Sequence, residues 1–280
     1  MDQLYPFEKE RLLKLSDPYL SWDYMQGPPP CNVQDFETPR LRQCPFNPGQ
    51  MSFSRRIDSG FDGCVWKVCF GSRRHFALKV FWENSPSEDF FYHAPQRECQ
   101  NAAVLQMMEA SLQQGAIALL NRPTTNHDAR FNYYAFCNQS REQKLPNRAV
   151  LDNPMVISSM PRMVRCYGWL QFDGSRFTSL PFPLQPLSPN IEGVRRQILR
   201  DEEYIALVYE WIEDGENTPA AVEDVARFLW RAGFCLSHSP LARNWKSGML
   251  VDHSDLIHVG GLGWKEHFYG RTSAEDVLLN

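Results

Sequence analysis

The sequence has few of the signals that mark secreted, membrane-spanning or zinc-binding proteins. It contains eight cysteines but no Cys-x-x-Cys pair, so it fits neither a zinc site nor a dense disulfide framework. Its first residues lack the basic and apolar regions of a signal peptide, and no apolar run approaches the about 20 residues that span a bilayer. We therefore expect an intracellular protein, cytoplasmic or nuclear, with reduced thiols and no membrane contact.

An excess of basic charge is also missing. The net charge is −4, so we expect no direct binding to nucleic acid. Residues 201–224 are rich in acidic side chains and contain no Lys or Arg, which indicates either a solvated face or a surface for a protein partner. The hydrophobic content of 43% and the charged content of 22% are ordinary for a globular chain, and 280 residues allow one large domain or two lobes.

The most informative stretch covers residues 56–79, where apolar and polar side chains alternate on both sides of two glycine-bearing turns. This pattern predicts three successive antiparallel strands. Gly60 and Gly63 lie in the first turn, where a backbone without a Cβ can approach a phosphate closely. Lys79 ends the run Phe-Ala-Leu-Lys in the third strand. We expect the functional site of the protein to be built around this stretch.

The remaining patterns divide the chain into an arm and two further regions. Residues 1–50 are predicted to form a short helix over 7–15 and then a proline-bearing arm that packs on the first lobe or docks elsewhere. Helical spacing predicts helices over 89–113 and 218–234, and alternation predicts a strand over 163–172. Residues 121–155 show no clear periodicity, and we interpret them as an insertion that makes a surface excursion.

The glycine turn, the strand lysine Lys79 and a glutamate on the next helix, Glu98, together resemble the nucleotide-binding lobe of a protein kinase. The resemblance implies an α+β fold with an antiparallel-sheet N-lobe (51–213) that carries one helix, and a reduced, mainly helical C-lobe (214–280). It implies an ion pair between Lys79 and Glu98 and hinge contacts from the backbone of residues 210 and 212. The nucleotide-binding positions would be Gly60, Gly63, Val65, Ala77, Lys79, Glu98, Glu210 and Ile212.

Kinase catalysis needs an aspartate as base and an asparagine and a second aspartate as magnesium ligands. In the register that the apolar residues 249–251 suggest, these three positions are occupied by Arg243, Gly248 and Val259. The resemblance therefore implies no catalytic residues and no metal site. Asp58 also stands where the glycine loop would have its first glycine.

Two alternatives to this inactive interpretation remain open. His238, Asp252 or Asp255 would take displaced catalytic roles if the chain were an atypical Ser/Thr kinase that uses ATP. Asp252 and Asp255 also flank a predicted turn, where short polar residues are expected on structural grounds. Residues 258–261 resemble the oxyanion loop of a hydrolase, but the sequence contains no Gly-x-Ser-x-Gly elbow to accompany it.

Several segments resemble one kinase-like family in particular, a family of filamentous fungi named after a fission-yeast kinetochore subunit. They are residues 77–81, 97–99, 165–170 and 208–212, and the resemblance covers roughly residues 44–265. It implies a pseudokinase that acts as an interaction module with protein partners. ATP, bound without magnesium, is the one cofactor that this interpretation allows, and a kinetochore role would follow from the family name.

Overall fold

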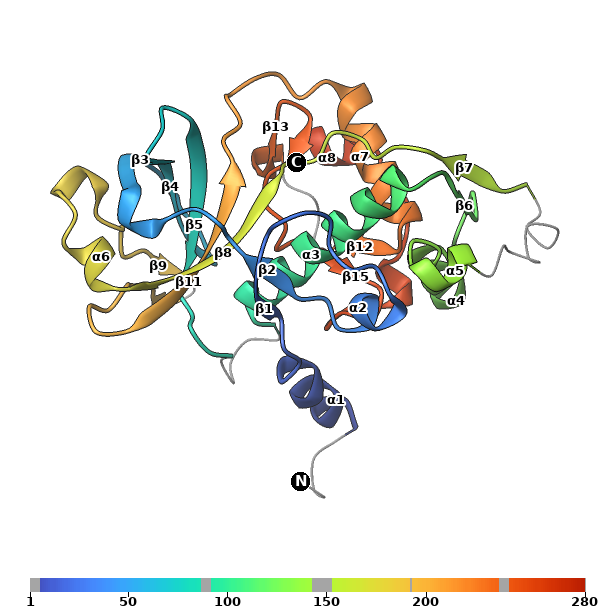
Figure 1. Ribbon diagram of the computed structural model, residues 1–280, viewed down its shortest axis with the longest axis horizontal. Helices are drawn as coiled ribbons and strands as arrows, with labels where there is room; N and C mark the ends of the chain where they lie inside the picture. The colour runs from blue at the N-terminus through green and yellow to red at the C-terminus, as the bar shows by residue number, and fades with distance from the viewer. Residues whose placement is uncertain (1–5, 87–91, 143–152, 192, 237–241, 280) are drawn as a thin grey trace.

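The computed structural model describes residues 6–86, 92–142, 153–191, 193–236 and 242–279. The protein is an α+β structure in which a seven-stranded, mostly antiparallel sheet occupies one half and most helices occupy the other (Figure 1). The strand order in the sheet is β1-β2-β8-β11-β5-β4-β3. Its strands are β1 (Leu20–Tyr24), β2 (Leu41–Gln43), β3 (Met51–Ser59), β4 (Gly63–Phe70), β5 (His75–Phe81), β8 (Cys166–Asp173) and β11 (Glu203–Glu210).

The helices are α1 (Pro6–Leu15), α2 (Val33–Glu37), α3 (Ala94–Gln113), α4 (Asn126–Tyr134), α5 (Asn138–Glu142), α6 (Ser175–Thr178), α7 (Pro219–Arg231) and α8 (Ala274–Leu278). Short strand pairs complete the structure: β6 (Ile117–Leu119) with β7 (Met155–Ile157), β9 (Asn190–Ile191) with β10 (Val194–Arg195), β12 (Phe234–Leu236) with β15 (Leu256–His258), and β13 (Trp245–Lys246) with β14 (Met249–Leu250). Among the described residues, none of these helices is both long and apolar enough to cross a membrane.

The three predicted antiparallel strands are confirmed as β3, β4 and β5, which form one side of the sheet with β3 at its edge. The strand predicted over 163–172 is β8, and β11 lies between β8 and β5. One face of this sheet forms an apolar cluster with the fully buried side chains of Trp66, Leu78 and Val80. Alternating burial along β4 therefore explains why the sequence pattern identified that strand, whereas residues 78–81 of β5 are all buried.

The described part of the N-terminal arm joins the sheet. It therefore packs on the first lobe, which was one of the two expectations, and does not dock elsewhere. β1 and β2 run parallel to each other, and β2 pairs with β8. The indole of Trp169 on β8 donates to the carbonyl of Ser21 at 2.9 Å, and Trp22 packs edge-on against the same indole at 4.9 Å between centroids. The arm thus packs on the sheet as an additional edge.

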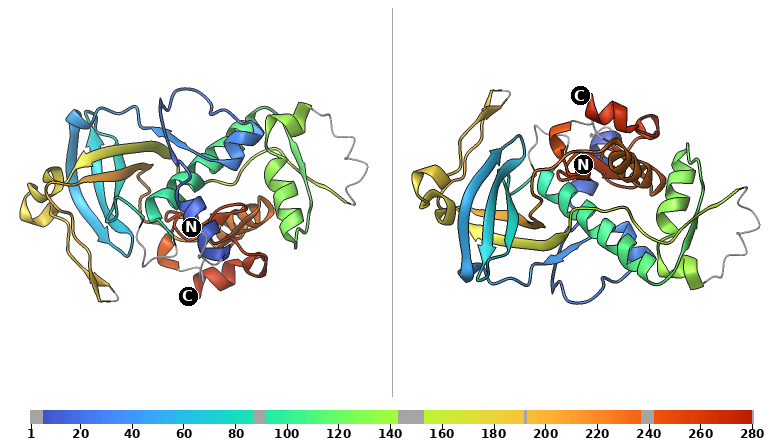
Figure 2. Two further views of the ribbon diagram at one scale, coloured as in Figure 1. Left: turned by 90° about the horizontal axis from the view of Figure 1, so that it is seen from below. Right: turned by 90° about the horizontal axis from the view of Figure 1, so that it is seen from above.

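Helix α3 lies between the sheet and the helical half of the molecule (Figures 1 and 2). It begins at Ala94, later than the predicted start at residue 89, and Pro95 occupies its first turn. Residues 87–91 lie outside the described part of the chain. Most of its side chains are buried, and the Asn101 amide donates to the carbonyls of His253 and Leu256 at 2.9 and 2.7 Å. The helix therefore holds the segment that leads into β15.

The prediction that residues 121–155 form a surface excursion is wrong for the described part of this range. Tyr133 on α4 and Phe136 after it are both fully buried, and Phe136 packs edge-on against Phe228 of α7. A capping box at Thr125 begins α4. The helix has only nine residues, so too few turns were present for helical periodicity to be recognised.

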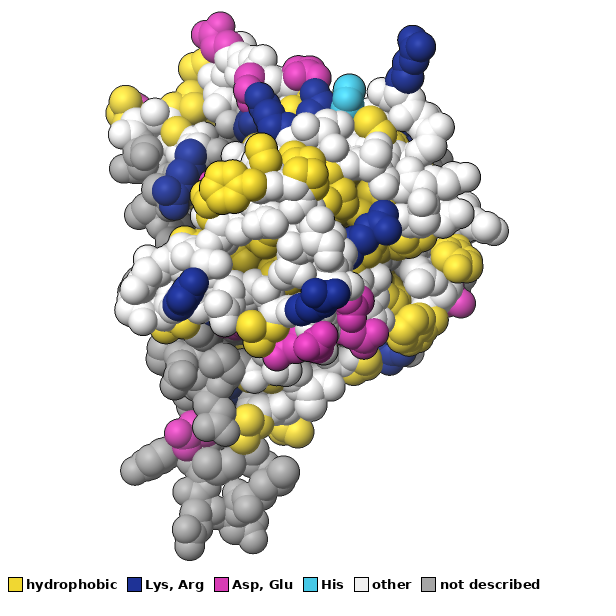
Figure 3. Space-filling view, turned by 90° about the vertical axis from the view of Figure 1, so that its left-hand side faces the viewer, with side chains coloured by type: hydrophobic (Ala, Val, Ile, Leu, Met, Phe, Trp, Pro, Cys, Tyr) yellow, Lys and Arg dark blue, Asp and Glu magenta, His cyan; other side chains and the backbone are white. Residues whose placement is uncertain are grey.

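The connection between β8 and β11 covers the outer side of β3 and β4. Arg56 donates to the carbonyl of Gln185, and the Trp66 indole donates to the carbonyl of Leu184 at 2.8 Å. Nearby Phe182 is 84% exposed. Apolar side chains accordingly appear among basic ones on this side of the molecule (Figure 3).

Candidate functional site

Three charged side chains from distant parts of the chain meet between β5, α3 and the segment after β14. The Lys79 ammonium lies 2.6 Å from the Glu98 carboxylate and 2.9 Å from Asp252 Oδ1. The Lys79 and Glu98 side chains are 9% and 0% exposed, whereas that of Asp252 is 33% exposed. The predicted ion pair is present, and Asp252 is a third member that the sequence register did not place there. We call these residues the Lys79 triad.

Burial and charge act against each other on every member of the Lys79 triad. Burial lowers the pKa of Lys79, but Asp252 and Glu98 together raise it well above its usual value. Burial raises the pKa of Glu98 to about 7, although Lys79 and the Tyr209 hydroxyl, which donates to its carboxylate at 2.9 Å, both lower it. Burial also raises the pKa of Asp252, but Lys79 and Ser254 outweigh it and leave that pKa well below its usual value.

Asp252 is held in place by the chain that follows it. Its Oδ1 accepts hydrogen bonds from the Ser254 amide at 3.1 Å and from the Ser254 hydroxyl at 2.8 Å. The β13–β14 pairing is extended by a hydrogen bond from the Val251 amide to the Asn244 carbonyl, at 2.8 Å. This pairing places Asn244 beside the turn that carries Asp252.

A further carboxylate, Asp255, accepts a hydrogen bond from the Asn244 amide at 2.6 Å. Its pKa is raised, first by burial and then by the negative charge of Asp252. Asp252, Asn244 and Asp255 thus bring three oxygen-bearing side chains to the region beside Lys79. Hard oxygen donors of this type are the ligands that Mg²⁺ prefers.

The described residues contain no group of three or more His, Cys, Asp or Glu side chains that would hold a metal unaided. An aspartate with an asparagine is a smaller donor set, and Mg²⁺ bound in this way is completed by waters and substrate phosphates. The side chains present therefore fit a magnesium ion that arrives with a nucleotide and do not fit a permanent metal centre.

His253, the residue after Asp252, is buried beside Tyr209. Its ring is 1% exposed and packs edge-on against Tyr209 at 5.7 Å. Burial lowers the pKa of His253 to about 4, so the ring is neutral at pH 7.

The surroundings of the two glycines in the first turn differ, and only one of the two positions requires glycine for steric reasons. A Cβ at Gly63 would lie 2.2 Å from the carbonyl oxygen of Val80, so the close approach of β4 and β5 requires glycine there. Gly60 has open space around its Cα, and its carbonyl accepts from the Trp82 indole at 3.0 Å. Only Gly60 therefore offers open backbone of the kind that a phosphate could approach.

The other predicted nucleotide positions lie on strands around the Lys79 triad. Val65 on β4 pairs with Lys79, and Ala77 lies two residues earlier on β5, and both side chains are half-buried. The Glu210 carboxylate forms an ion pair with Arg162 at 2.5 Å. Ile212 follows β11 and packs against the cluster beneath the sheet.

The three residues assigned to the lost catalytic positions lie apart from one another. Arg243 is exposed, and Gly248 sits in the β13–β14 turn at φ +75°, where a Cβ would lie 2.5 Å from that of Ala221. Val259 is 3% exposed in the apolar core, and its amide donates to the Gly233 carbonyl at 3.0 Å. The carboxylate that contacts Lys79 from this part of the chain belongs instead to Asp252. His238, the alternative catalytic residue, lies outside the described residues.

A sequence signal for Asp252 was present but was ambiguous. The apolar run 249–251 ends at Asp252, and Asn244 precedes that run by a few residues. Short apolar stretches recur at 245–251 and 256–259. The position of the kinase magnesium aspartate, which adjoins such a stretch, can therefore be assigned to either Asp252 or Val259. Only the contact with Lys79 distinguishes the two.

Neither protein-family models nor curated proteins give a match to this chain.

Proposed function

We propose that this protein is a kinase-like pseudokinase that binds ATP together with Mg²⁺ and transfers phosphate poorly or not at all. The observation that carries the proposal is the Lys79 triad, in which a strand lysine contacts a helix glutamate and an aspartate. Active kinases need both the lysine–glutamate pair and the magnesium aspartate in place. The three antiparallel strands β3–β5 are followed by α3, and the later sheet strands β8 and β11 are followed by α7, which also supports a kinase-like fold.

The proposal aligns the kinase catalytic motif differently from the sequence analysis, which placed its metal ligands at Gly248 and Val259. With Asp252 as the magnesium aspartate, Asn244 becomes the catalytic-loop asparagine, because both side chains lie at the β13–β14 hairpin. The kinase pattern has its catalytic aspartate five residues before this asparagine. That position is Ser239, which lies outside the described residues. A serine is no general base at neutral pH, so the expected loss in rate is about 10²–10⁴.

In this register each residue has a defined role toward the nucleotide. Lys79 supplies positive charge to the phosphates, and Asp252 and Asn244 hold the magnesium ion. The ion, when bound, would neutralise phosphate charge. The resemblance also assigns adenine contacts to the backbone of residues 210 and 212. Glu98 keeps Lys79 oriented, and the Tyr209 hydroxyl in turn holds Glu98.

A second candidate, an atypical Ser/Thr kinase, is favoured by one observation. Asp255 has a raised pKa and is hydrogen-bonded to Asn244, so a second carboxylate lies beside the proposed metal ligands. A carboxylate with a raised pKa is a better proton acceptor than an ordinary one. In this alternative Asp255 would accept the substrate hydroxyl proton in place of the missing aspartate.

The role as a protein interaction module remains part of the proposal and follows from the resemblance to the fungal family. The acidic stretch 201–224 offers one surface for a protein partner. Any kinetochore setting follows from that resemblance alone.

A thermal-shift titration with ATP, with and without Mg²⁺, tests the proposal on the full chain. We expect ATP to raise the Tm in the presence of Mg²⁺, and we expect Asp252→Asn and Lys79→Met each to remove the shift. Asp224→Asn, an exposed change on α7, is the matched control and should keep the shift. A shift that needs no Mg²⁺ would support the metal-free interpretation, and no shift at all would refute nucleotide binding.

Radiolabelled ATP separates the two candidates. The pseudokinase proposal predicts no phosphate transfer to the chain itself or to a general protein substrate. Transfer that is lost in both Asp252→Asn and Asp255→Asn would instead establish the atypical kinase.

A further inference from the structure

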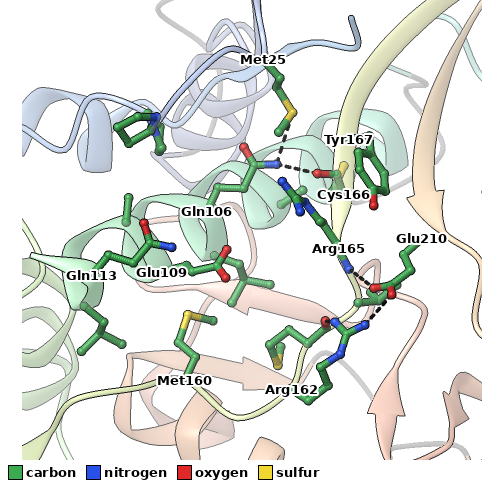
Figure 4. Close-up of a pocket in the computed structure, with 18 of the residues that line it drawn as sticks. Met25, Gln106, Glu109, Gln113, Met160, Arg162, Arg165, Cys166, Tyr167 and Glu210 are labelled. Atoms are coloured by element: carbon green, nitrogen blue, oxygen red, sulfur yellow. Dashed lines mark hydrogen bonds and ion pairs between the residues drawn. The ribbon is translucent and has the colours of Figure 1, made fainter. Parts of the chain in front are cut away.

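A pocket of about 770 Å³ lies between α3, the arm segment 25–29 and the segment 158–167 (Figure 4). Its volume falls within the range of about 300–1,000 Å³ that is typical of pockets for small molecules. Its α3 lining continues along the helix beyond Glu98, over residues 102–113, and includes none of the three residues of the Lys79 triad. None of the roles proposed for the Lys79 triad uses this pocket.

The apolar part of the pocket is formed largely by flexible side chains. Met25 comes from the arm, Met160 and Met163 from the segment before β8, and Leu105 from α3. Methionine side chains are unbranched and adapt to ligands of irregular shape. This wall therefore suits an alkyl chain or a similar apolar body.

The charged part of the pocket has an excess of positive side chains. Its lining includes four arginines and two glutamates: Arg42, Arg74, Arg162, Arg165, Glu109 and Glu210. Arg162 is already paired with Glu210. Within the described part of the chain the Arg165 guanidinium has no carboxylate partner and contacts only the Tyr167 ring, 5.1 Å from its centroid. Its side chain extends into the pocket toward α3 (Figure 4).

The lining also includes a buried polar group that lacks a well-formed partner. His253 is 1% exposed, and neither of its ring nitrogens makes a hydrogen bond of normal geometry. A buried polar group left in this way is unfavourable, because it has lost its hydrogen bonds to water. A ligand with an oxygen near the ring would supply the missing partner.

We propose that this pocket binds a small organic anion with an apolar body, of which a medium-chain carboxylate is the simplest example. The carboxylate binds to Arg165, with Arg74 as the neighbouring cation at the same end. The apolar body lies among Met25, Met160 and Met163. The lining includes Glu210 and His253 but no residue of the Lys79 triad. Decanoate binding is measured without nucleotide, so its failure and the failure of the proposed function are distinguishable.

Isothermal titration of the full chain with decanoate, kept below the concentration at which it forms micelles, tests the site. We expect saturable binding that Arg165→Ala weakens at least about tenfold, because a hydrogen bond to a charged group is lost. Arg73→Ala, which removes an exposed arginine outside the pocket, is the matched control and should leave binding unchanged. Decanol, which has the same apolar chain without the charge, should bind at least about tenfold more weakly than decanoate for the same reason.

Met160→Glu provides a second variant that keeps every arginine. It places a negative charge in the apolar wall, and we expect it to abolish decanoate binding while the unfolding curve without ligand stays unchanged. The proposal is refuted if decanoate shows no saturable binding, if Arg73→Ala and Arg165→Ala weaken binding equally, or if decyltrimethylammonium binds as tightly as decanoate.

Discussion

Replacing Lys79 with methionine removes the only cation of the Lys79 triad and keeps a side chain of similar length. The change leaves Glu98, which is fully buried, and Asp252 without their shared partner. Removing one partner of a buried ion pair costs about 3–5 kcal/mol. We expect a loss of this size in the free energy of unfolding at pH 8.

The size of this loss should depend on pH, and the direction follows from Glu98. The pKa of Glu98 is already about 7 with Lys79 present, and Lys79 lowers it. Without Lys79 the pKa of Glu98 rises further, so the folded variant takes up a proton at neutral pH that the unfolded chain does not hold. Stability then falls as pH rises toward the new folded pKa, by about 1.36 kcal/mol for each pH unit. The difference between wild type and variant should therefore be larger at pH 8 than at pH 6.

Urea denaturation of both proteins at the two pH values measures this difference. Lys67→Met is the matched control, because Lys67 lies on the neighbouring strand and its partner Glu213 is 77% exposed. Such a surface pair is worth about 0–1 kcal/mol. The double variant Lys79→Met/Glu98→Gln should lose the pH dependence. A loss below about 1 kcal/mol for Lys79→Met, or one that is equal at pH 6 and pH 8, would contradict the reasoning.

Three further predictions concern stability. Gly63→Ala should lower the free energy of unfolding by about 1–3 kcal/mol, since its Cβ would meet a backbone oxygen, whereas Gly60→Ala, with open space, should cost little in the same urea experiment. Tyr209→Phe should cost about 1.5–3 kcal/mol, because a hydrogen bond to a charged group is lost. Burial lowers the pKa of His253 to about 4 and that of His258 to about 3, so the unfolded chain binds more protons below pH 6.5. Stability measured by denaturation should therefore fall from pH 6.5 to pH 4, with His253 alone contributing on the order of 3 kcal/mol against the opposite effect of the Lys79 triad.

Local periodicity was sufficient to predict β3, β4, β5, β8 and α7, and burial follows the period most clearly on β4 and on the apolar face of α7. It did not indicate β11, where the four consecutive side chains 206–209 are buried. It could not predict the pairing of β1 and β2 with the sheet. Those strands are short, and their position depends on contacts such as that of Trp22 with Trp169. Helix α4 was missed for the related reason that nine residues are too few to show a period.

The candidate site was predictable only where its parts lie close in sequence. Lys79 and Glu98 are separated by one strand end and one helix start, so their pairing followed from the order of elements. Asp252 is 173 residues from Lys79, and no local pattern distinguishes an aspartate that reaches a buried lysine from one that begins a turn. The contact between Lys79 and Asp252 in the folded protein was therefore needed to align the kinase catalytic motif with this sequence.

The Lys79 triad is a costly way to join a strand to a helix, and this cost is an argument about function. Burying charges requires their removal from water, and replacing a buried ion pair with packed apolar side chains is often neutral or stabilising. A protein that used β5 and α3 only as a scaffold would be served at least as well by an apolar contact. A lysine held between Glu98 and a partly exposed aspartate is better explained by a ligand that needs both a cation and an oxygen donor, which is the requirement of a nucleotide bound with magnesium.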